Sequence, residues 1–523
     1  MKNTKKFQCT FNNMFDFNNM PFIENMAVID SIANKEYTYK ELNQYIRDLA
    51  KGLIAKGLES QDTIAVMATS SANYLALTLA ALKLGITISL LDVNYKSREL
   101  HYILNKCKPK MFIADKMILD NLDIYTLLTD TLGINKSDII PLDNDYTLQE
   151  LIQAGSGISD FTLDLVISGV QEGDPAAIHF TSGTTGHPKA VVHTYESIVN
   201  GIIASNISYN YSSKDSILLA LPMFHVMGYE LTALLALSTG ATLVTIGKFR
   251  TSTALDALEE YKCTAFHGVP TMYHFMLNEK KTHSLQHLKI GMIGGSVTSA
   301  QERLNIIEKL GLDRLINVYG QTEIFAASQT DINIPIEEQV KTTGKPLNNV
   351  TIRVVDNKGQ ALPPCCKGEI LIKTTSCMHM YLDDPTATLN TVKEDWVYTG
   401  DLGHLTEDGY LVLDGRIKDI IIKGGENISP IEIENVLKEH PLIENACVLG
   451  QFDPLYGEEV AAVIITKDNL PIDISALQLY CSQHLANYKI PKYIKTVAKL
   501  PITSSGKIQK YKLKEELNEA SNN

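Results

Sequence analysis

The sequence predicts an α/β fold, in which a large N-terminal domain of sheets with packed helices precedes a small α+β C-terminal domain. Three observations support this prediction. A chain of 523 residues is long enough to form more than one domain. Strands and helices alternate between residues 63 and 91, as they do when helices cover the faces of a parallel sheet. After residue 417, short strands are interspersed with two helices.

The N-terminal part of the chain contains clear local signals. Residues up to about 30 look like an irregular lead-in. Thr38 and Glu41 form a capping box that opens a helix, and apolar residues at helical spacing continue it. We then expect a buried strand, a helix, a second strand and a surface connection, at residues 63–67, 74–84, 86–91 and 140–174 respectively.

The C-terminal part has signals of its own. Residues 420–428 read as a strand pair that turns at Gly424 and Gly425. Ser429 and Glu432 form a capping box, and Pro430 suits the first position of the helix that follows. Three more strands and one more helix are expected, at residues 447–450, 459–466, 493–500 and 474–485 respectively.

Composition limits the class of protein. The formal net charge of −13 argues against a general nucleic-acid binder. The eight cysteines form neither a Cys-x-x-Cys pair nor a metal-ligand spacing, so reduced thiols are the simplest account. The N-terminus lacks the apolar core of a signal peptide, and no uncharged run is long enough to span a bilayer. A cytoplasmic protein without an integral membrane segment is therefore expected.

One stretch carries most of the chemistry. Residues 180–192 read Phe-Thr-Ser-Gly-Thr-Thr-Gly-His-Pro-Lys-Ala-Val-Val, between two short apolar runs that we interpret as strands. Glycines let backbone N–H groups converge on an anion, hydroxyls donate further hydrogen bonds, and lysine adds a positive charge. A polyphosphate would suit this set, although composition alone would also fit a flexible surface turn. The residues concerned are Thr181, Ser182, Gly183, Thr184, Thr185, Gly186 and Lys189.

The spacing excludes the usual nucleotide-triphosphate loop, in which lysine directly follows the second glycine and a helix begins at once. Here Pro188 precedes Lys189, and the helix begins only near Tyr195 with Thr194 as its N-cap. The order Thr-Ser-Gly-Thr-Thr-Gly-x-Pro-Lys instead resembles the phosphate loop of the AMP-forming acyl/aryl-CoA synthetase, adenylation-domain and luciferase superfamily. Further motifs of that family follow in order, and the resemblance extends from about residue 35 to about residue 510.

The resemblance implies a domain division and an ATP site. It divides the chain into an AMP-binding (adenylation) domain at residues 1–416 and a mobile C-terminal domain at residues 417–523. Tyr319 would stack on adenine, Thr322 would contact the α-phosphate, and Glu323 would hold Mg²⁺. Asp401 and Arg416 would bind the ribose hydroxyls. The other implied ATP-binding positions outside the phosphate loop are Gly295, Ser296, Asn317 and Gly320.

The same resemblance places an acyl pocket after the strand that breaks at Pro222. His225 would gate this pocket, although a lone histidine at a strand end is more often simply packed. The other implied pocket residues are Val226, Met227, Gly268, Gly294 and Gly295. Amino-acid-activating relatives carry an aspartate in this segment, but none lies between Leu221 and Glu230, and Glu230 falls beyond the pocket-facing positions. A buried unpaired ammonium is costly, so we expect an acid without an α-amino group. The glycine floor at Gly294 and Gly295 and the apolar residues after His225 favour a fatty or aryl acid.

The implied reaction has two halves. A carboxylate and MgATP form acyl-AMP, and a thiol then displaces AMP. Lys507 would bridge the substrate carboxylate and the α-phosphate, Lys418 would be the hinge, and Gly424 with Gly425 would lie beside the pantetheine arm of coenzyme A. The catalytic set implied by the resemblance is Lys507, Thr184, Lys189, Glu323 and His225.

Three alternatives stay open. A stand-alone enzyme could load the acyl group onto a separate carrier protein instead of coenzyme A. A non-catalytic adenylate-binding protein is disfavoured, because no motif lysine or acid is missing. Luciferase-like oxidation would require a special substrate. A monomer or homodimer acting on a small carboxylic acid is expected.

Overall fold

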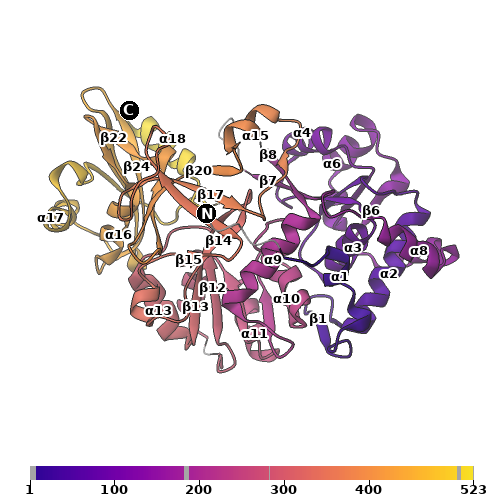
Figure 1. The fold of residues 1–523 in the computed structure, drawn as a ribbon. Helices are drawn as coiled ribbons and strands as arrows, with labels where there is room; N and C mark the ends of the chain where they lie inside the picture. The colour runs from indigo at the N-terminus through magenta and orange to yellow at the C-terminus, as the bar shows by residue number, and fades with distance from the viewer. Residues whose placement is uncertain (1–6, 182–187, 282, 503–507, 522–523) are drawn as a thin grey trace.

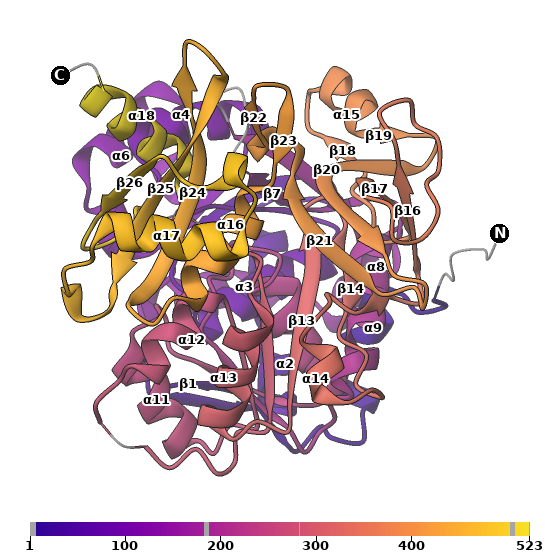
Figure 2. The ribbon, with the colours of Figure 1, turned by 90° about the vertical axis from the view of Figure 1, so that its left-hand side faces the viewer.

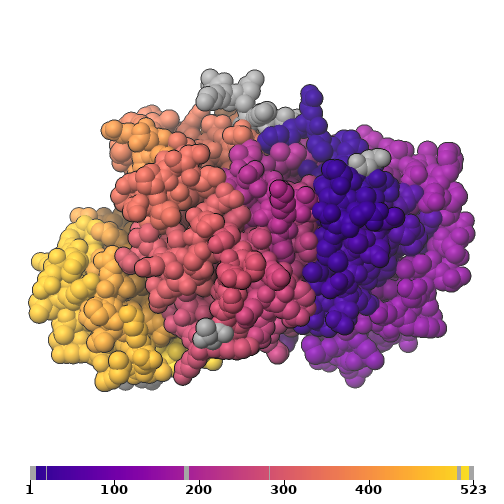
Figure 3. Space-filling view, turned by 90° about the horizontal axis from the view of Figure 1, so that it is seen from below, coloured from indigo at the N-terminus to yellow at the C-terminus, as the bar shows by residue number. Residues whose placement is uncertain are grey.

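Four β-sheets and the helices packed on them organise the chain (Figure 1). The computed structural model describes residues 7–181, 188–281, 283–502 and 508–521. The first strands and helices lie at one end of the molecule and the last ones at the other, as the space-filling view also shows (Figure 3). The mixed α/β architecture predicted from the sequence is confirmed.

The largest sheet has nine strands, and its central strands are parallel. Every residue of the two strands at residues 265–268 and 290–294 is buried, as expected for parallel strands covered on both faces. In spatial order the strands are β15 (Lys345–Pro346), β14 (Phe325–Gln329), β13 (Arg314–Gln321), β12 (Ile290–Gly294), β11 (Ala265–Gly268), β9 (Ser216–Leu219), β10 (Thr242–Thr245), β1 (Met26–Asp30) and β2 (Lys35–Thr38).

A second sheet of seven strands contains the flanks of the phosphate loop. Its parallel part is the βα alternation predicted from residues 63–91, and two antiparallel strands extend it at one edge. In spatial order the strands are β18 (Met380–Tyr381), β8 (Lys189–Thr194), β7 (Pro175–Thr181), β4 (Thr87–Leu90), β3 (Thr63–Met67), β5 (Met111–Ala114) and β6 (Ile139–Pro141).

Two helices lie between these sheets. Helix α3 (Ala72–Lys83) contacts both β1 and β4, and α9 (Tyr195–Tyr209) contacts both β8 and β14. Every residue of α3 is buried, which suits a helix that is apolar on all sides. Thr194 caps α9, and Thr38 with Glu41 forms the predicted capping box of α2 (Tyr39–Ala55). Apolar side chains from both sheets thus join in one large core.

The remaining helices of this region cover the outer faces and the connections. They are α1 (Phe11–Met14), η1 (Phe17–Asn19), α4 (Ser97–Cys107), α5 (Lys116–Leu119), α6 (Leu122–Thr126), η2 (Leu127–Thr131), η3 (Lys136–Asp138), α7 (Asp145–Ala154), η4 (Gly155–Gly157), α8 (Asp160–Ser168), η5 (Tyr229–Leu234), α10 (Leu235–Thr239), α11 (Thr251–Glu260), α12 (Pro270–Leu277), α13 (Ala300–Leu310), α14 (Ile336–Gln339) and α15 (Pro385–Thr391). Within the described ranges, no helix is both long and apolar enough to cross a membrane.

A third, antiparallel sheet leads towards the C-terminal region. Its strands are β16 (Val350–Val355), β17 (Gly368–Thr374), β20 (Trp396–Leu405), β19 (Val392–Lys393) and β21 (Leu411–Arg416). The register between β20 and β21 sets Asp401 directly opposite Arg416. The predicted hairpin at residues 408–416 is therefore confirmed: these residues form the turn after β20 and the second strand, β21.

The fourth sheet is covered by helices on both faces (Figure 2). One apolar cluster contains Ile433 of α16 (Pro430–Glu439) and Leu477 of α17 (Ile474–His484), and another contains Leu513 of α18 (Lys510–Ser521). The strands are β22 (Ile421–Lys423), β23 (Glu426–Ile428), β24 (Ile443–Asp453), β25 (Gly457–Thr466) and β26 (Tyr493–Thr496). Short 3₁₀ turns connect this region: η6 (Ile417–Asp419), η7 (Lys467–Asn469) and η8 (Asn487–Lys489). The domain boundary at residues 416 and 417 stays a prediction.

Three local predictions were wrong. Residues 140–174 contain the helices α7 and α8, which a polar, weakly periodic sequence concealed. The irregular lead-in contains α1 and strand β1. At α16, Ser429 is the N-cap residue but makes no capping hydrogen bond, because its hydroxyl donates to the backbone carbonyl of Asp414 instead.

Candidate active site

The ends of four parallel strands bring the predicted site together. Strands β9, β11, β12 and β13 run in the same direction, so their carboxyl ends meet at one edge of the large sheet. Ligands of open α/β sheets bind outside such an edge. The predicted acyl-pocket and adenine-site residues lie in the last residues of these strands or in the segments that follow them.

The phosphate loop joins two strands, as predicted, and these strands pair in antiparallel orientation. Strand β7 ends at Thr181 and β8 begins at Lys189, and these two residues are register partners. Ser182, Gly183, Thr184, Thr185 and Gly186 lie outside the described residues.

Tyr381 contacts both Lys189 and Glu323. The ammonium nitrogen of Lys189 lies 4.5 Å from the ring centroid of Tyr381, within the range of a cation–π contact. The Tyr381 hydroxyl donates a 2.7 Å hydrogen bond to Oε1 of Glu323. Burial and the Glu323 carboxylate together raise the pKa of Tyr381, so this hydroxyl stays protonated and keeps donating. Tyr381 lies on β18, which pairs with β8 and contacts α15 (Figure 2).

Asp401 is the centre of a second cluster. Its Oδ1 accepts one 2.8 Å hydrogen bond from Nε of Arg416, and its Oδ2 accepts from the Tyr319 hydroxyl at 2.8 Å and from Nε2 of Gln321 at 2.6 Å. Burial, followed by the Asp401 charge, raises the pKa of Tyr319 well above its ordinary value. Burial opposes the charge of Arg416, but the Asp401 carboxylate outweighs it and raises the Arg416 pKa. The predicted adenine and ribose residues are thus in direct contact.

The predicted acyl gate begins after β9. Its tight turn requires Gly228, because a Cβ there would lie 2.1 Å from the Pro222 carbonyl oxygen. The ring of His225 lies 4.6 Å from that of Phe224, and Val226 is buried. A Cβ at Gly294 would lie 3.3 Å from the terminal methyl of Met227, so this glycine and this methionine pack together. The contact between Gly294 and Met227 is thus apolar, and the role of these residues in an acyl pocket stays a prediction.

Other predicted positions have different surroundings. A Cβ at Gly268 would lie 2.7 Å from the Phe266 ring, so this position backs onto the core. Gly295 and Ser296 are exposed, and Gly295 has a φ of +87°, which favours glycine. Asn317 is buried, and its side-chain amide donates to the Thr342 carbonyl. Gly320 is exposed, and the Thr322 carbonyl accepts a 2.7 Å hydrogen bond from His193.

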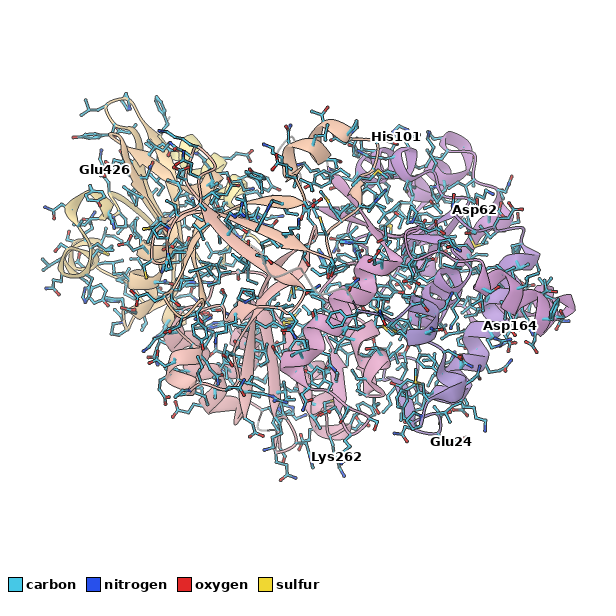
Figure 4. All side chains as sticks on the ribbon, viewed as in Figure 1. Glu24, Asp62, His101, Asp164, Lys262 and Glu426 are labelled. Carbon is cyan, nitrogen blue, oxygen red and sulfur yellow. The ribbon has the colours of Figure 1, made fainter. Side chains whose placement is uncertain are left out.

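The C-terminal residues lie on turns. Gly424 and Gly425 both have positive φ and are exposed at the turn between β22 and β23. Glu426, at the same turn, marks its position in Figure 4. Lys418 lies in η6 and is exposed. Lys507 lies outside the described residues, but the described flanks converge, since Ile502 and Ile508 form an antiparallel bridge.

Family models match both parts of the chain. A model for AMP-binding enzymes matches residues 18–382, and a model for the AMP-binding enzyme C-terminal domain matches residues 432–507. The chain belongs to the AMP-binding enzyme family. The resemblance to AMP-forming acyl-CoA synthetases is thereby confirmed, and the protein is an AMP-forming acid–thiol ligase.

Individual family members are similar along almost their whole length. The chain is 32% identical to the medium-chain fatty-acid–CoA ligase of Escherichia coli, over 94% of this chain and 87% of that one. It is 30% identical to the indoleacetate–CoA ligase of Aromatoleum aromaticum, over 91% and 92% respectively. ATP-bound MatB from Rhodopseudomonas palustris, at 25% identity, superposes with a TM-score of 0.85 over 98% of this chain and all of MatB. The apo form of that enzyme gives 0.75, so this chain is closer to the ATP-bound arrangement.

Magnesium is the metal that the family resemblance implies, and the residues present fit it. Mg²⁺ bound to nucleotide phosphates needs only one or two carboxylates. Glu323 uses one hydrogen bond of its four or so lone-pair sites for Tyr381, which leaves oxygen for a cation. The described residues contain no group of three or more His, Cys, Asp or Glu side chains that could hold a metal by themselves. The single carboxylate of Glu323 fits a Mg²⁺ ion whose other ligands would be nucleotide phosphates and water.

Several residues of this AMP-binding enzyme site were missed by sequence reasoning. Gln321 stands inside the quoted Tyr319–Glu323 motif, and its proximity to Tyr319 could have drawn attention to it. Tyr381 follows no recognisable pattern and lies 58 residues from Glu323. The buried residues His179 and His193 hydrogen-bond to the backbone carbonyls of Phe224 and Thr322 in two motif segments, but carry no sequence signal of their own. Glu230 lies beyond the pocket-facing positions in sequence, and nothing in the sequence indicates its pairing with His179.

Proposed function

We propose that this enzyme activates a medium-chain fatty acid with ATP and transfers the acyl group to coenzyme A. The observation that carries the choice of acid is the arrangement of Glu230, the acidic residue nearest to the gate in sequence. Its carboxylate is buried and hydrogen-bonded to His179 at 2.8 Å, so it is already committed to a cationic partner. The apolar packing of Met227 on Gly294 then suits an uncharged tail.

The similarity to a bacterial medium-chain fatty-acid–CoA ligase supports the same choice. An aryl acid is the second candidate, because the indoleacetate–CoA ligase is similar over a comparable length. Both acids share an apolar body and a single carboxylate, which is the chemistry that the gate accommodates.

In the first half-reaction, a carboxylate oxygen of the acid attacks the α-phosphorus of ATP. A bond forms between that oxygen and phosphorus, the bond to the β-phosphate oxygen breaks, and pyrophosphate leaves. Both reactants are anionic, so catalysis depends on positioning and on positive charge. Asp401, with Arg416 and Tyr319, would hold the nucleoside, and Lys189 and Lys507 would supply charge. A bound Mg²⁺ at Glu323 would neutralise phosphate charge.

In the second half-reaction, the sulfur of coenzyme A attacks the acyl carbon. A thioester bond forms, the bond from that carbon to the AMP oxygen breaks, and the thiol proton is released. We propose that rotation about Lys418 withdraws Lys507 and brings Gly424 and Gly425 beside the pantetheine arm. Their exposure and positive φ values provide a turn without side chains for that approach.

One assay tests this proposal. Pyrophosphate release is measured across straight-chain fatty acids of increasing length and several aryl acids, with and without coenzyme A. We expect a maximum at medium chain length, and one coenzyme A consumed for each pyrophosphate released. Accumulation of acyl-AMP in the presence of coenzyme A, together with acylation of a phosphopantetheinyl carrier protein, would favour the carrier-loading alternative.

The two half-reactions can also be separated. Lys507→Ala should slow acyl-AMP formation by about a hundred- to a thousandfold, comparable with loss of a key electrostatic contact. Thioester formation from supplied acyl-AMP should remain. Lys418→Pro should do the reverse, because proline restricts φ at the hinge. Equal damage to both steps in both variants would contradict the rotating-domain mechanism.

A further inference from the structure

A buried histidine links the two halves of the site. His179 lies on β7, two residues before Thr181, and its Nε2 is 2.8 Å from Oε1 of Glu230 in η5. The side chains of His179 and Glu230 are 2% and 0% exposed. The other ring nitrogen, Nδ1, lies 3.3 Å from the backbone carbonyl oxygen of Phe224 in the acyl gate.

The chemistry of these partners fixes the state of the ring. A carboxylate and a carbonyl oxygen can only accept hydrogen bonds, so both ring nitrogens of His179 must carry a proton to satisfy them. The ring is then an imidazolium that forms a buried ion pair with Glu230. Burial opposes this charge, but the Glu230 carboxylate and the hydrogen bonds outweigh burial and raise the pKa of His179. Among the described residues, Oε2 of Glu230 has no hydrogen-bond partner, so His179 is the main compensation for its charge.

The other end of the gate is held by a different histidine. Thr232 donates its hydroxyl proton to the Met227 carbonyl at 2.6 Å, so its oxygen must accept from Nδ1 of His267 at 2.8 Å. The Tyr211 hydroxyl then donates to Nε2 of His267, also at 2.8 Å. This chain needs a neutral ring, and burial lowers the pKa of His267 to about 3. Two backbone carbonyls of the gate, at Phe224 and Met227, are therefore fixed by two buried histidines.

We propose that His179 and Glu230 are positioning residues for the acid substrate, because their ion pair fixes the acyl gate to the strand that carries the phosphate loop. This inference rests on the proposed acyl-pocket role of residues 224–227. Neither side chain needs to touch the acid. Loss of the ion pair frees the Phe224 carbonyl, moves the gate relative to the bound nucleotide, and weakens selection among acids.

The experiment uses the full-length enzyme with two variants, His179→Gln and Glu230→Gln. Glutamine at position 179 can still donate to Glu230 but cannot also reach Phe224, and glutamine at position 230 keeps an acceptor while removing the charge. The matched control is His283→Gln, which changes a second histidine–carboxylate pair, with Asp256, that lies outside the proposed site. Its histidine side chain is also only 2% exposed.

Acyl-AMP formation is measured for a series of fatty acids, with KM determined separately for acid and for ATP, and thermal unfolding is recorded for each protein. We expect both site variants to lower kcat/KM for the best acid by about tenfold or more, the effect of losing a buried charged hydrogen bond. The difference between good and poor acids should narrow, while KM for ATP stays at the wild-type value. The control should retain the wild-type preference among acids.

Two results would overturn the inference. One is an unchanged preference among acids in both folded site variants. The other is a loss of the same proportion for every acid and for ATP, which is the signature of a merely structural pair. If the wild-type enzyme itself forms no acyl-AMP from any acid, the proposed function fails, and this inference fails with it.

Discussion

The nucleotide side and the acid side of the site are held together in different ways. On the nucleotide side, Asp401 gathers Tyr319, Gln321 and Arg416, all of which lie in or next to recognisable motifs. Arg416 is 47% exposed, so part of this cluster faces solvent. On the acid side, the gate is held through its backbone carbonyls by His179 and His267, which lie on other strands and are fully buried.

This difference predicts which substitutions should affect ligand binding alone and which should also affect the stability of the fold. Asp401 and Tyr319 are themselves buried, but Arg416 is about half exposed, so water can replace part of the pairing that is lost when this cluster is weakened. A buried ion pair behaves differently, since removing one partner leaves an uncompensated charge inside the protein. Changes on the nucleotide side should therefore act on ATP binding, whereas changes on the acid side should act on both acid selection and folding.

The largest expected effect comes from breaking the buried pair at one end. His179→Leu leaves the Glu230 carboxylate buried without its partner, and should lower the free energy of unfolding by about 3–5 kcal/mol. The double variant His179→Leu/Glu230→Leu buries no charge and should recover much of that loss. Urea unfolding of both proteins measures the difference. A double variant as unstable as the sum of its two single variants would show that the pair does not act as a unit.

A smaller effect is expected on the nucleotide side. Asp401→Asn keeps the volume but removes the charge that Arg416 faces, and should weaken ATP binding by about 1.5–3 kcal/mol, roughly ten- to a hundredfold. Isothermal titration with ATP checks this value, and preference among acids should not change. Asp414→Asn on the same hairpin is the control, because Asp414 pairs with His404 and Lys367 instead. Equal weakening in both variants would argue against a specific role for Asp401.

The third effect concerns pH, and it accumulates as the pH falls. Burial, together with the neighbouring His179, lowers the pKa of His193 to about 3, and burial lowers that of His267 similarly. Below the ordinary histidine pKa, the unfolded chain binds protons at these residues that the folded protein does not bind. The free energy of unfolding should therefore fall by about 1.4 kcal/mol per pH unit for each histidine, as the pH drops from about 6.5 towards 3.

The contribution of His179 to the free energy of unfolding should change with pH in the opposite direction. Its raised pKa gives a stabilisation that is complete below the ordinary histidine pKa and is lost as the pH rises through the folded value.

His193→Gln, which can still donate to the Thr322 carbonyl, should reduce the slope of the free energy of unfolding against pH in the acidic range by about 1.4 kcal/mol per pH unit. Denaturant unfolding at several acidic pH values measures the slope. An unchanged slope would mean that His193 is protonated in the folded protein.

The same contrast explains what the sequence could predict. The βα alternation, the flanks of the phosphate loop and the hairpin ending at Arg416 follow from local patterns, and the strand register then pairs Thr181 with Lys189 and Asp401 with Arg416. The helices in residues 140–174 were missed because polar residues weaken their periodicity. The Ser429 capping box was wrong because a distant carbonyl, at Asp414, competes for the hydroxyl.

The acid side was predictable only in part. Gate residues 225–227 belong to a recognisable segment, but the groups that hold them do not. His179 and Glu230 are 51 residues apart in sequence, and a histidine inside an apolar strand looks the same whether it is merely packed or paired. Only the fold shows that two acceptors flank its ring. Tyr381 is a similar case, since its contact with Glu323 depends on the pairing of β18 with β8.

One measurement tests the separation of the two sides most directly. Acyl-AMP formation by Asp401→Asn and His179→Gln is titrated with ATP at saturating acid, and with a series of fatty acids at saturating ATP. We predict a crossed result: Asp401→Asn raises KM for ATP and leaves the preference among acids intact, whereas His179→Gln narrows the preference among acids and leaves KM for ATP intact. Parallel changes in both variants, for both substrates, would contradict it.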